Sequence, residues 1–316
     1  GIVREEYTST GTDSWVTQFG DSTAGFPVDR TGTRSVHIVS PHVITQPGAM
    51  SAFDMGENQT LTVDTGAYLL NQAPFGGTTS VVFTIDGTYE EEQDGSHEDW
   101  AAQSSGATVV INGLYLSKSG HFVGTGGVFT GNGEIDLYTG IDGPLAGDWT
   151  GFTGVMKAVV TGTHAIGVAL GHFQVGAGVT STFSASAAVT LVTVVATGVW
   201  NTGVITDKVA EVANAGTTTL GANATIPTVG NTGTLNLVTY DLAGATVTGN
   251  GAVTLTSQTF AGDWSGVTGT ITQTATGTVA ADVALPSFAI AAGVTSTFTA
   301  SAAVTAMTVA ATGIAN

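Results

Sequence analysis

The densest cluster of ionisable side chains is the ten-residue segment EEEQDGSHED, residues 90–99. Carboxylate oxygens gathered on a flexible loop are the ligands that Ca²⁺ prefers in proteins. The segment lacks the Asp-x-Asp-x-Asp-Gly spacing of an EF-hand, so a solvated loop between strands is the alternative. The calcium hypothesis depends on Glu90, Glu91, Glu92, Asp94, Glu98 and Asp99. No other cofactor is predicted.

A second candidate for chemistry is Asp64, in the segment LTVDTGAYLL. Asp-Thr-Gly after an apolar strand resembles the aspartic-protease motif, in which two aspartates share one proton and activate water. The sequence holds no second Asp-Thr-Gly or Asp-Ser-Gly, so another chain would have to supply the partner. We expect the simpler interpretation, a strand that ends in a turn. We predict no catalytic residues and no enzyme activity.

Two Asp-Trp pairs stand in equivalent segments, AGDWTG at 146–151 and AGDWSG at 261–266. An indole ring beside a carboxylate can stack on a sugar and accept its hydroxyls, which makes Asp148, Trp149, Asp263 and Trp264 candidate glycan contacts. The alternative is that each tryptophan packs over a turn while the aspartate bonds the local backbone. The six histidines are scattered through the chain, and we expect structural or surface roles for them.

The charge balance excludes several classes of partner. The 316 residues include only 6 Lys and Arg against 24 Asp and Glu, giving a net charge of -18. Nucleic-acid binding and electrostatic docking on anionic lipid both need clustered basic residues. There is no cysteine, and no apolar run approaches the length of a membrane-spanning helix. We therefore expect neither a nucleic-acid partner nor membrane insertion.

The elements that must position these residues are β-strands. Short runs of Val, Thr, Ile and Phe alternate with polar or small residues and end at Gly or Asn, which is the period-two pattern of strands. One segment, residues 207–213, is compatible with a turn or two of helix. The fold class is predicted to be all-β.

An internal repeat indicates how the strands are arranged. Residues 146–201 align without gaps on residues 261–316, with 34 of 56 positions identical. A β-solenoid, in which each turn contacts only its neighbours, and tandem β-sandwiches are both compatible with a repeat of this length. Asn-Thr-Gly corners between short strands, in VATGVWNTGVIT (195–206) and near 231, favour the solenoid. Val189, Val194, Val304 and Val309 are expected in its core, with Val304→Asp collapsing the C-terminal turns.

Three sections follow from this pattern. Residues 1–75, which are not repetitive, are predicted to cap or anchor the array. Residues 76–201 form a repeat region with the first copy, and residues 202–316 form one with the second. The last turn presents a strand edge, and exposed edges recruit other chains. We expect a partner subunit to cover it, so that removal of residues 305–316 changes the oligomeric state.

Three segments carry a resemblance to known families: VVINGLYLSKSGHFVGTGGVFTGNGEIDLYTG (109–140), ATVTGNGAVTLTSQTFAGDWSG (245–266) and IAAGVTSTFTASAAVTAMTVAATG (290–313). They are similar to repeats of phage decoration, spike and fibre proteins and of bacterial adhesins and autotransporter passengers. The resemblance implies a non-catalytic structural protein on a virion surface that binds itself and other particle proteins. An exported adhesin or filament subunit on a bacterial surface is one alternative, and a carbohydrate-binding module with a glycan partner is another.

Overall fold

The chain folds as a parallel β-solenoid of about 11 turns, which confirms the predicted fold class. Sandwich domains pair their strands antiparallel, whereas the strands here pair in parallel, as in β10 on β12 and β25 on β27, so the sandwich alternative is wrong. The computed structural model describes residues 5–19, 34–46, 53–55, 59–72, 75–77, 81–92, 107–118, 127–141, 145–185, 188–203, 209–281, 283–299 and 303–316. In this part of the chain no helix is long and apolar enough to cross a bilayer.

The strands belong to two compact units. Unit 1 comprises Gly1–Ala158 with Ala165–Gly171, and unit 2 comprises Val159–His164 with His172–Asn316. The division falls inside the first copy of the repeat. Strands from residues 1–75 join the same ladders as the later strands of unit 1, and the capping or anchoring role of that section stays a prediction.

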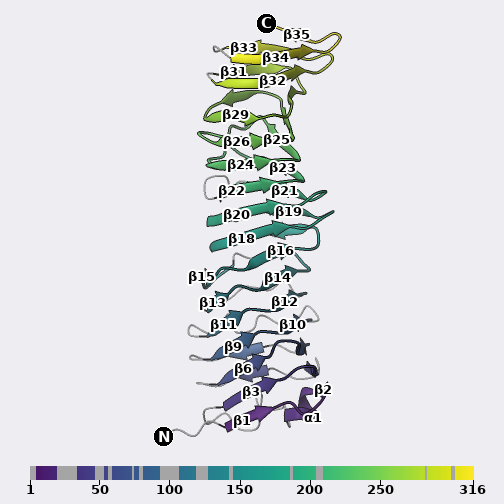
Figure 1. Ribbon diagram of the computed structural model, residues 1–316, viewed down its shortest axis with the longest axis vertical. Helices are drawn as coiled ribbons and strands as arrows, with labels where there is room; N and C mark the ends of the chain where they lie inside the picture. The colour runs from purple at the N-terminus through teal and green to yellow at the C-terminus, as the bar shows by residue number, and fades with distance from the viewer. Residues whose placement is uncertain are drawn as a thin grey trace. The chain divides into compact units, whose positions relative to one another are not determined.

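Unit 1 is built from two parallel sheets (Figure 1). A helix, α1 (Trp15–Phe19), lies against β2 and β4 with Trp15 and Phe19 buried. The first sheet contains β1 (Glu5–Thr8), β3 (Arg34–Ile38), β6 (Thr60–Val63), β9 (Val82–Ile85), β11 (Thr108–Ile111), β13 (Val128–Gly131) and β15 (Asp148–Phe152). The second contains β2 (Asp13–Ser14), β4 (Val43–Gln46), β7 (Tyr68–Asn71), β10 (Thr88–Glu91), β12 (Leu114–Ser117), β14 (Glu134–Leu137) and β16 (Val155–Ala158), while β5 (Phe53–Met55) pairs with β8 (Phe75–Gly77).

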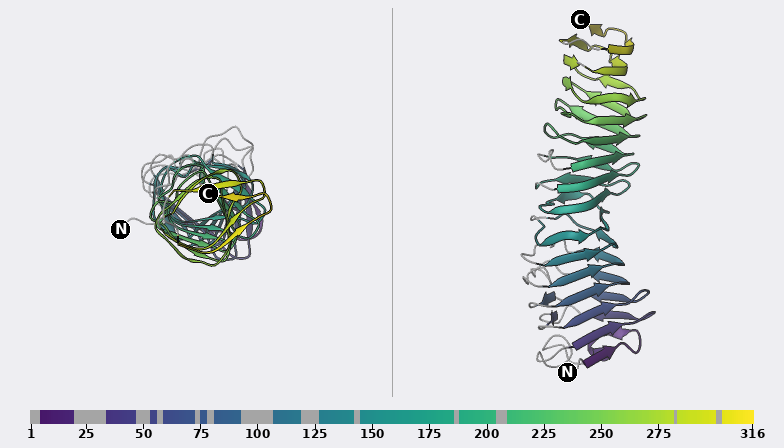
Figure 2. Two further views of the ribbon diagram at one scale, coloured as in Figure 1. Left: turned by 90° about the horizontal axis from the view of Figure 1, so that it is seen from above. Right: turned by 60° about the vertical axis from the view of Figure 1, so that its left-hand side comes forward.

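Unit 2 is built from three parallel sheets, whose strands lie in successive layers in the right-hand view of Figure 2, from teal to yellow. The first sheet contains β17 (Gly162–His164), β19 (Thr180–Phe183), β21 (Val199–Asn201), β23 (Thr217–Thr219), β25 (Thr234–Val238), β27 (Ala252–Leu255), β30 (Ile271–Gln273), β32 (Ala284–Ile290) and β34 (Ala303–Val309). The second contains β20 (Ala188–Val194), β22 (Val209–Asn214), β24 (Thr228–Asn231), β26 (Thr246–Gly249) and β29 (Asp263–Val267). The third contains β28 (Gln258–Phe260), β31 (Gly277–Ala281), β33 (Thr295–Phe298) and β35 (Ile314–Ala315); β18 (Ala169–Val175) has residues in both units.

The helix considered for residues 207–213 is wrong, because strand β22 begins at Val209. Val209 pairs with Val189 of β20, and Val212 pairs with Val192. Both β22 valines are buried. Pairing and burial outweigh the weak helical preference of the segment, as tertiary context often does.

The four valines predicted to lie in the core differ in burial, depending on whether another strand pairs beyond the strand that carries them. Val189 and Val194 of β20 are buried as predicted, since β22 pairs with β20. Val304 and Val309 occupy the equivalent places in β34, which is the last strand of its sheet. Val309 is 44% exposed and Val304 is half-buried, so their placement in a closed core is wrong.

A polar ladder closes one corner of unit 2. Asn214 donates a side-chain hydrogen bond of 2.8 Å to the Oδ1 of Asn231 in the next turn. The position that follows in the ladder is Gly249, where φ is +108° and an added Cβ would lie 2.1 Å from the Asn231 carbonyl oxygen. The turns approach so closely here that only glycine fits.

A buried histidine lies in the core of unit 2. His164 has no exposed surface, contacts the Phe173 ring edge-on, and its Nδ1 lies 3.0 Å from the Ser181 hydroxyl. Burial lowers the pKa of His164 to about 4, because a charged imidazolium loses its hydration there. The second copy carries Val279 at the equivalent place.

We predict that His164 makes folding sensitive to acid. A depressed folded-state pKa means that the unfolded chain binds more protons between pH 6.5 and about 4, so stability falls as the pH falls through that window. The contribution is at most about 3 kcal/mol. Thermal unfolding followed by circular dichroism should show a smaller acid-induced fall in Tm for His164→Val than for the wild-type chain. An identical pH profile for the two proteins would contradict this.

A matched pair of substitutions tests the difference between the two copies. Val189→Asp places an unpaired carboxylate in a closed core, and we expect a loss of about 4 kcal/mol or more in unfolding free energy. Val304→Asp, at the equivalent half-buried position, should lower Tm much less, because solvent reaches its neighbourhood. Equal losses of Tm in the two variants would show that the last turn is closed in solution.

Candidate functional site

Both candidate tryptophans are core residues. Trp149 is 2% exposed, stacks on Phe129 with ring centroids 3.9 Å apart, and donates its indole N–H to the Ala146 carbonyl at 2.8 Å. Trp264 is 1% exposed and donates to the Ala261 carbonyl at 3.0 Å. Neither indole offers a face to a sugar in this structure. The packing role that the sequence left open is the one observed.

The neighbouring aspartates point the other way. Asp148 and Asp263 are exposed, because successive side chains of a strand alternate between its faces. Each carboxylate accepts hydrogen bonds from the residue two places on, Thr150 or Ser265, and these bonds lower the pKa of both aspartates. The predicted glycan contact therefore retains only its two carboxylates.

The acidic segment is divided between the inside and the outside of the solenoid. Glu90 is 8% exposed and pairs with Lys118, which lies nearer the solvent, whereas Glu91 is 2% exposed and accepts a 2.8 Å hydrogen bond from the Tyr115 hydroxyl. Glu92 accepts one from Gln72 at 3.2 Å. Asp94, Glu98 and Asp99 lie outside the described residues. Among the residues that are described, no three His, Asp or Glu side chains form a metal-binding group, and calcium binding stays a prediction.

Beside the buried Glu91, a phenol is held neutral. Tyr89 is fully buried and accepts a 3.1 Å hydrogen bond from Asn71. Burial, and then the charge of Glu91, raise the pKa of Tyr89 well above its ordinary value. The two groups form a polar cluster inside unit 1 that contributes to its packing.

Asp64 lies at a turn between strands. The backbone N–H of Ala67 donates to the Asp64 carbonyl at 2.8 Å, and Gly66 has a φ of +82°. The Asp64 carboxylate lies 3.6 Å from the Nδ1 of His37. The turn expected from the sequence is present.

A cation lies between two carboxylates on the outer face of β14 and β16. The Lys157 ammonium is 2.9 Å from Glu134 and 3.6 Å from Asp136. Partial burial, together with a hydrogen bond to Glu134, raises the pKa of Asp136 to about 6, while Lys157 lowers the pKa of Glu134. Two carboxylates with separated pKa values resemble an acid and base pair, but an ion-pair network perturbs pKa values in the same way.

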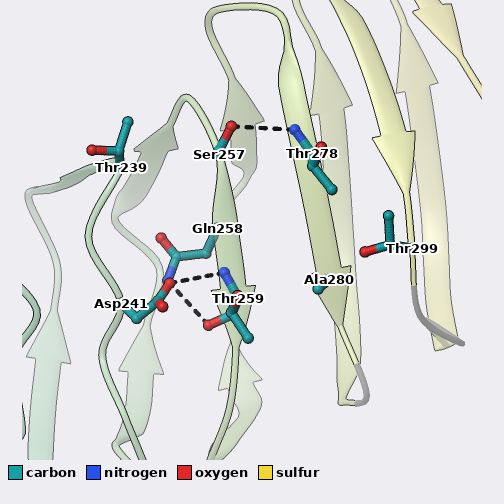
Figure 3. A pocket seen from close by; sticks show the side chains of 8 residues that line it. All are labelled: Thr239, Asp241, Ser257, Gln258, Thr259, Thr278, Ala280 and Thr299. Atoms are coloured by element: carbon teal, nitrogen blue, oxygen red, sulfur yellow. Dashed lines mark hydrogen bonds between the residues drawn. The ribbon is translucent and has the colours of Figure 1, made fainter.

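A polar groove of about 290 Å³ lies in unit 2 (Figure 3). One wall is the connection between β25 and β26, and the rest is made by β28, β31 and the residue that follows β33. Its lining residues are Thr239, Asp241, Ser257, Gln258, Thr259, Thr278, Ala280 and Thr299. They present hydroxyls, one carboxylate and one amide, with neither a basic nor an aromatic side chain among them.

Hydrogen bonds fix the polar groups of this groove. Asp241 Oδ1 accepts the backbone N–H of Thr259 at 2.8 Å and the side-chain amide N–H of Gln258 at 3.0 Å. The Gln258 amide also donates to the Thr259 carbonyl at 3.3 Å. Because both neighbours are acceptors, the side-chain atom that faces them must be the amide nitrogen. Its Oε1 has no hydrogen-bond partner in the described structure, although Gln258 is 4% exposed. An unsatisfied buried acceptor costs about 1–3 kcal/mol.

These features define a parallel β-solenoid protein with a polar groove on one of its sheets. Comparisons with protein-family models, with curated proteins and with solved structures find no match to the chain.

Sequence reasoning missed the groove. Asp241 and Gln258 lie in the section between the two copies, whereas Thr278, Ala280 and Thr299 belong to the second copy or lie on its strands. The groove forms because equivalent strands of the two copies lie in different sheets. β17 and β19 of the first copy belong to the nine-stranded sheet, whereas their counterparts β31 and β33 belong to the four-stranded sheet. Residue spacing alone does not show this difference.

We predict that Asp136 opposes stability at neutral pH. Its raised pKa means that the folded chain holds an extra proton between pH 3.8 and about 6, so its contribution falls as the pH rises through that window. With allowance for solvent screening, the effect is on the order of 1 kcal/mol. The Tm of Asp136→Asn minus that of wild type should increase from pH 4 to pH 7. A difference independent of pH would contradict the raised pKa.

Proposed function

We propose that the protein is a non-catalytic structural component of a particle surface, in the first place a virion decoration, spike or fibre protein. The observation that carries the proposal is the parallel β-solenoid of about 11 turns, whose strand edges and apolar β-faces can pair with another chain. An exported bacterial adhesin or extracellular filament subunit is the alternative, since pairing of this kind serves either assembly.

The open face consists of Met307, Val309 and Ile314, which are 45%, 44% and 50% exposed. In the first copy, Val192 and Val194 stand where Met307 and Val309 stand in the second, and both are 0% exposed. The difference is that β22 pairs with the first-copy strand β20. The open face therefore has the shape and chemistry to receive another parallel turn, which a second copy of the chain can provide.

Charge does not oppose this contact locally. Residues 283–316 contain no Asp, Glu, Lys, Arg or His, although the whole chain has a net charge of -18. Like charges elsewhere keep the chains apart at long range, so association must depend on the uncharged end. Backbone N–H and C=O groups along β34 add edge pairing to the apolar contact.

The parallel ladders suit a mechanical role. Each turn shares backbone hydrogen bonds with its neighbours, as in the six paired positions of β32 and β34. A load along the stack is therefore shared, between any two neighbouring turns, by several hydrogen bonds that act in parallel. This distribution supports a structural function for the surface protein.

The oligomeric state tests the proposal. Light scattering after size exclusion, with electron microscopy of the same sample, should show a closed oligomer of the 1–316 chain at neutral pH and micromolar concentration. The double substitution Met307→Lys with Ile314→Lys should yield monomers, because it places cations on the open face. Thr219→Lys, at a half-buried outward position of β23, is the control and should leave the mass unchanged.

Each outcome of that experiment is informative. Open filaments would favour the extracellular fibre over the particle protein. A wild-type monomer, or an oligomer that persists in the double variant, would overturn association through the open face.

A further inference from the structure

The polar groove on β28 and β31 has a chemistry that selects its ligand. Its wall carries the hydroxyls of Thr239, Ser257, Thr278 and Thr299 together with the Asp241 carboxylate. A phosphate or sulfate needs basic side chains, and a nucleobase needs an aromatic or guanidinium platform; the lining provides neither. Side-chain hydroxyls and a single carboxylate can hydrogen-bond a neutral ligand that is rich in hydroxyl groups.

The buried amide of Gln258 holds the Asp241 carboxylate in place. Gln258 is held by Asp241 and by the Thr259 carbonyl, and this leaves its Oε1 without a donor among the described residues. In Figure 3 the Gln258 side chain points toward Asp241, with Oε1 on the side of Thr239. This oxygen is buried, and Gln258 pairs with the core residue Val279, so the amide acts on the groove by fixing the Asp241 carboxylate.

The carboxylate has room for a second donor. Asp241 uses Oδ1 for both of its hydrogen bonds, and Oδ2 accepts none from the described side chains and backbone. A ligand hydroxyl can therefore donate to Asp241 Oδ2, and a neighbouring hydroxyl of the same ligand can bond a threonine hydroxyl of the groove wall. Ala280 and the threonine methyl groups supply apolar contact for the C–H face of a ring.

From this geometry we propose that the groove binds one ring of a neutral pyranose sugar. The volume of about 290 Å³ lies at the small end of ligand sites, which span about 300–1,000 Å³, and fits one ring rather than a long chain. The site is distinct from Trp149 and Trp264, whose indoles are buried. It adds glycan recognition to a structural protein and does not depend on how the chains associate.

Ligand-observed saturation-transfer NMR on the 1–316 chain tests the site, with the methyl glycosides of glucose, galactose and mannose as probes at millimolar concentration. We expect saturation transfer to at least one of them. Ala280→Phe fills the groove and should weaken binding tenfold or more. Ala252→Phe is the matched control, because Ala252 is exposed on β27 in the same unit and does not line the groove.

A second pair of variants addresses the polar contacts. Asp241→Ala removes the carboxylate and releases Gln258, and should abolish the transfer. Glu211→Ala removes an exposed carboxylate of β22, elsewhere in unit 2, and should preserve it. Melting curves of all four variants establish that each is folded. No transfer to any of the three glycosides, or equal transfer with Ala280→Phe and Ala252→Phe, would overturn the site, whatever the oligomeric state proves to be.

Discussion

Every buried side chain of the solenoid depends on a neighbouring turn, because a single turn of β-strand cannot bury its own inner face. Val192 is buried because strand β22 pairs with the strand that carries it. Met307, at the equivalent place in the second copy, is exposed to solvent. Nearly the same phrase of sequence is core in one place and surface in the other. Stacking therefore determines the environment of each residue, and local sequence determines only which residues face inward.

Stacking also limits what the corners can contain. Gly249 has no room for a Cβ beside the Asn231 carbonyl. The Asn214 side-chain amide donates a hydrogen bond to Asn231 in the following turn. Such contacts satisfy buried polar groups and hold the register, because a shift by one residue would turn the inward side chains outward. Neighbouring turns do not satisfy every buried atom: Asn214 Oδ1 and Gln258 Oε1 are among those without a hydrogen-bond partner in the described residues.

Period and repeat sufficed to predict the all-β class, the solenoid and the inward valines of β20. They did not predict strand β22, since residues 207–213 also fit a helical pattern and only the ladder with β20 decides between the two. Val309 was misplaced because a repeat does not show which of its strands is paired on one side only. For Trp149, the residue types fitted both a sugar platform and a core, and only the stack on Phe129 separates them.

The groove shows why duplication need not duplicate a site. Thr278 and Ala280 of β31 have counterparts Thr163 and Ala165 in the first copy, where Ala165 is 4% exposed. In the second copy the strand lies in another sheet, beside β28, and the β25–β26 connection contributes Asp241 to the same groove. A ligand would thus be recognised by residues from both a repeat and the section between repeats. Binding specificity in such a chain can change when a strand changes sheets, while the sequence of the repeat stays almost the same.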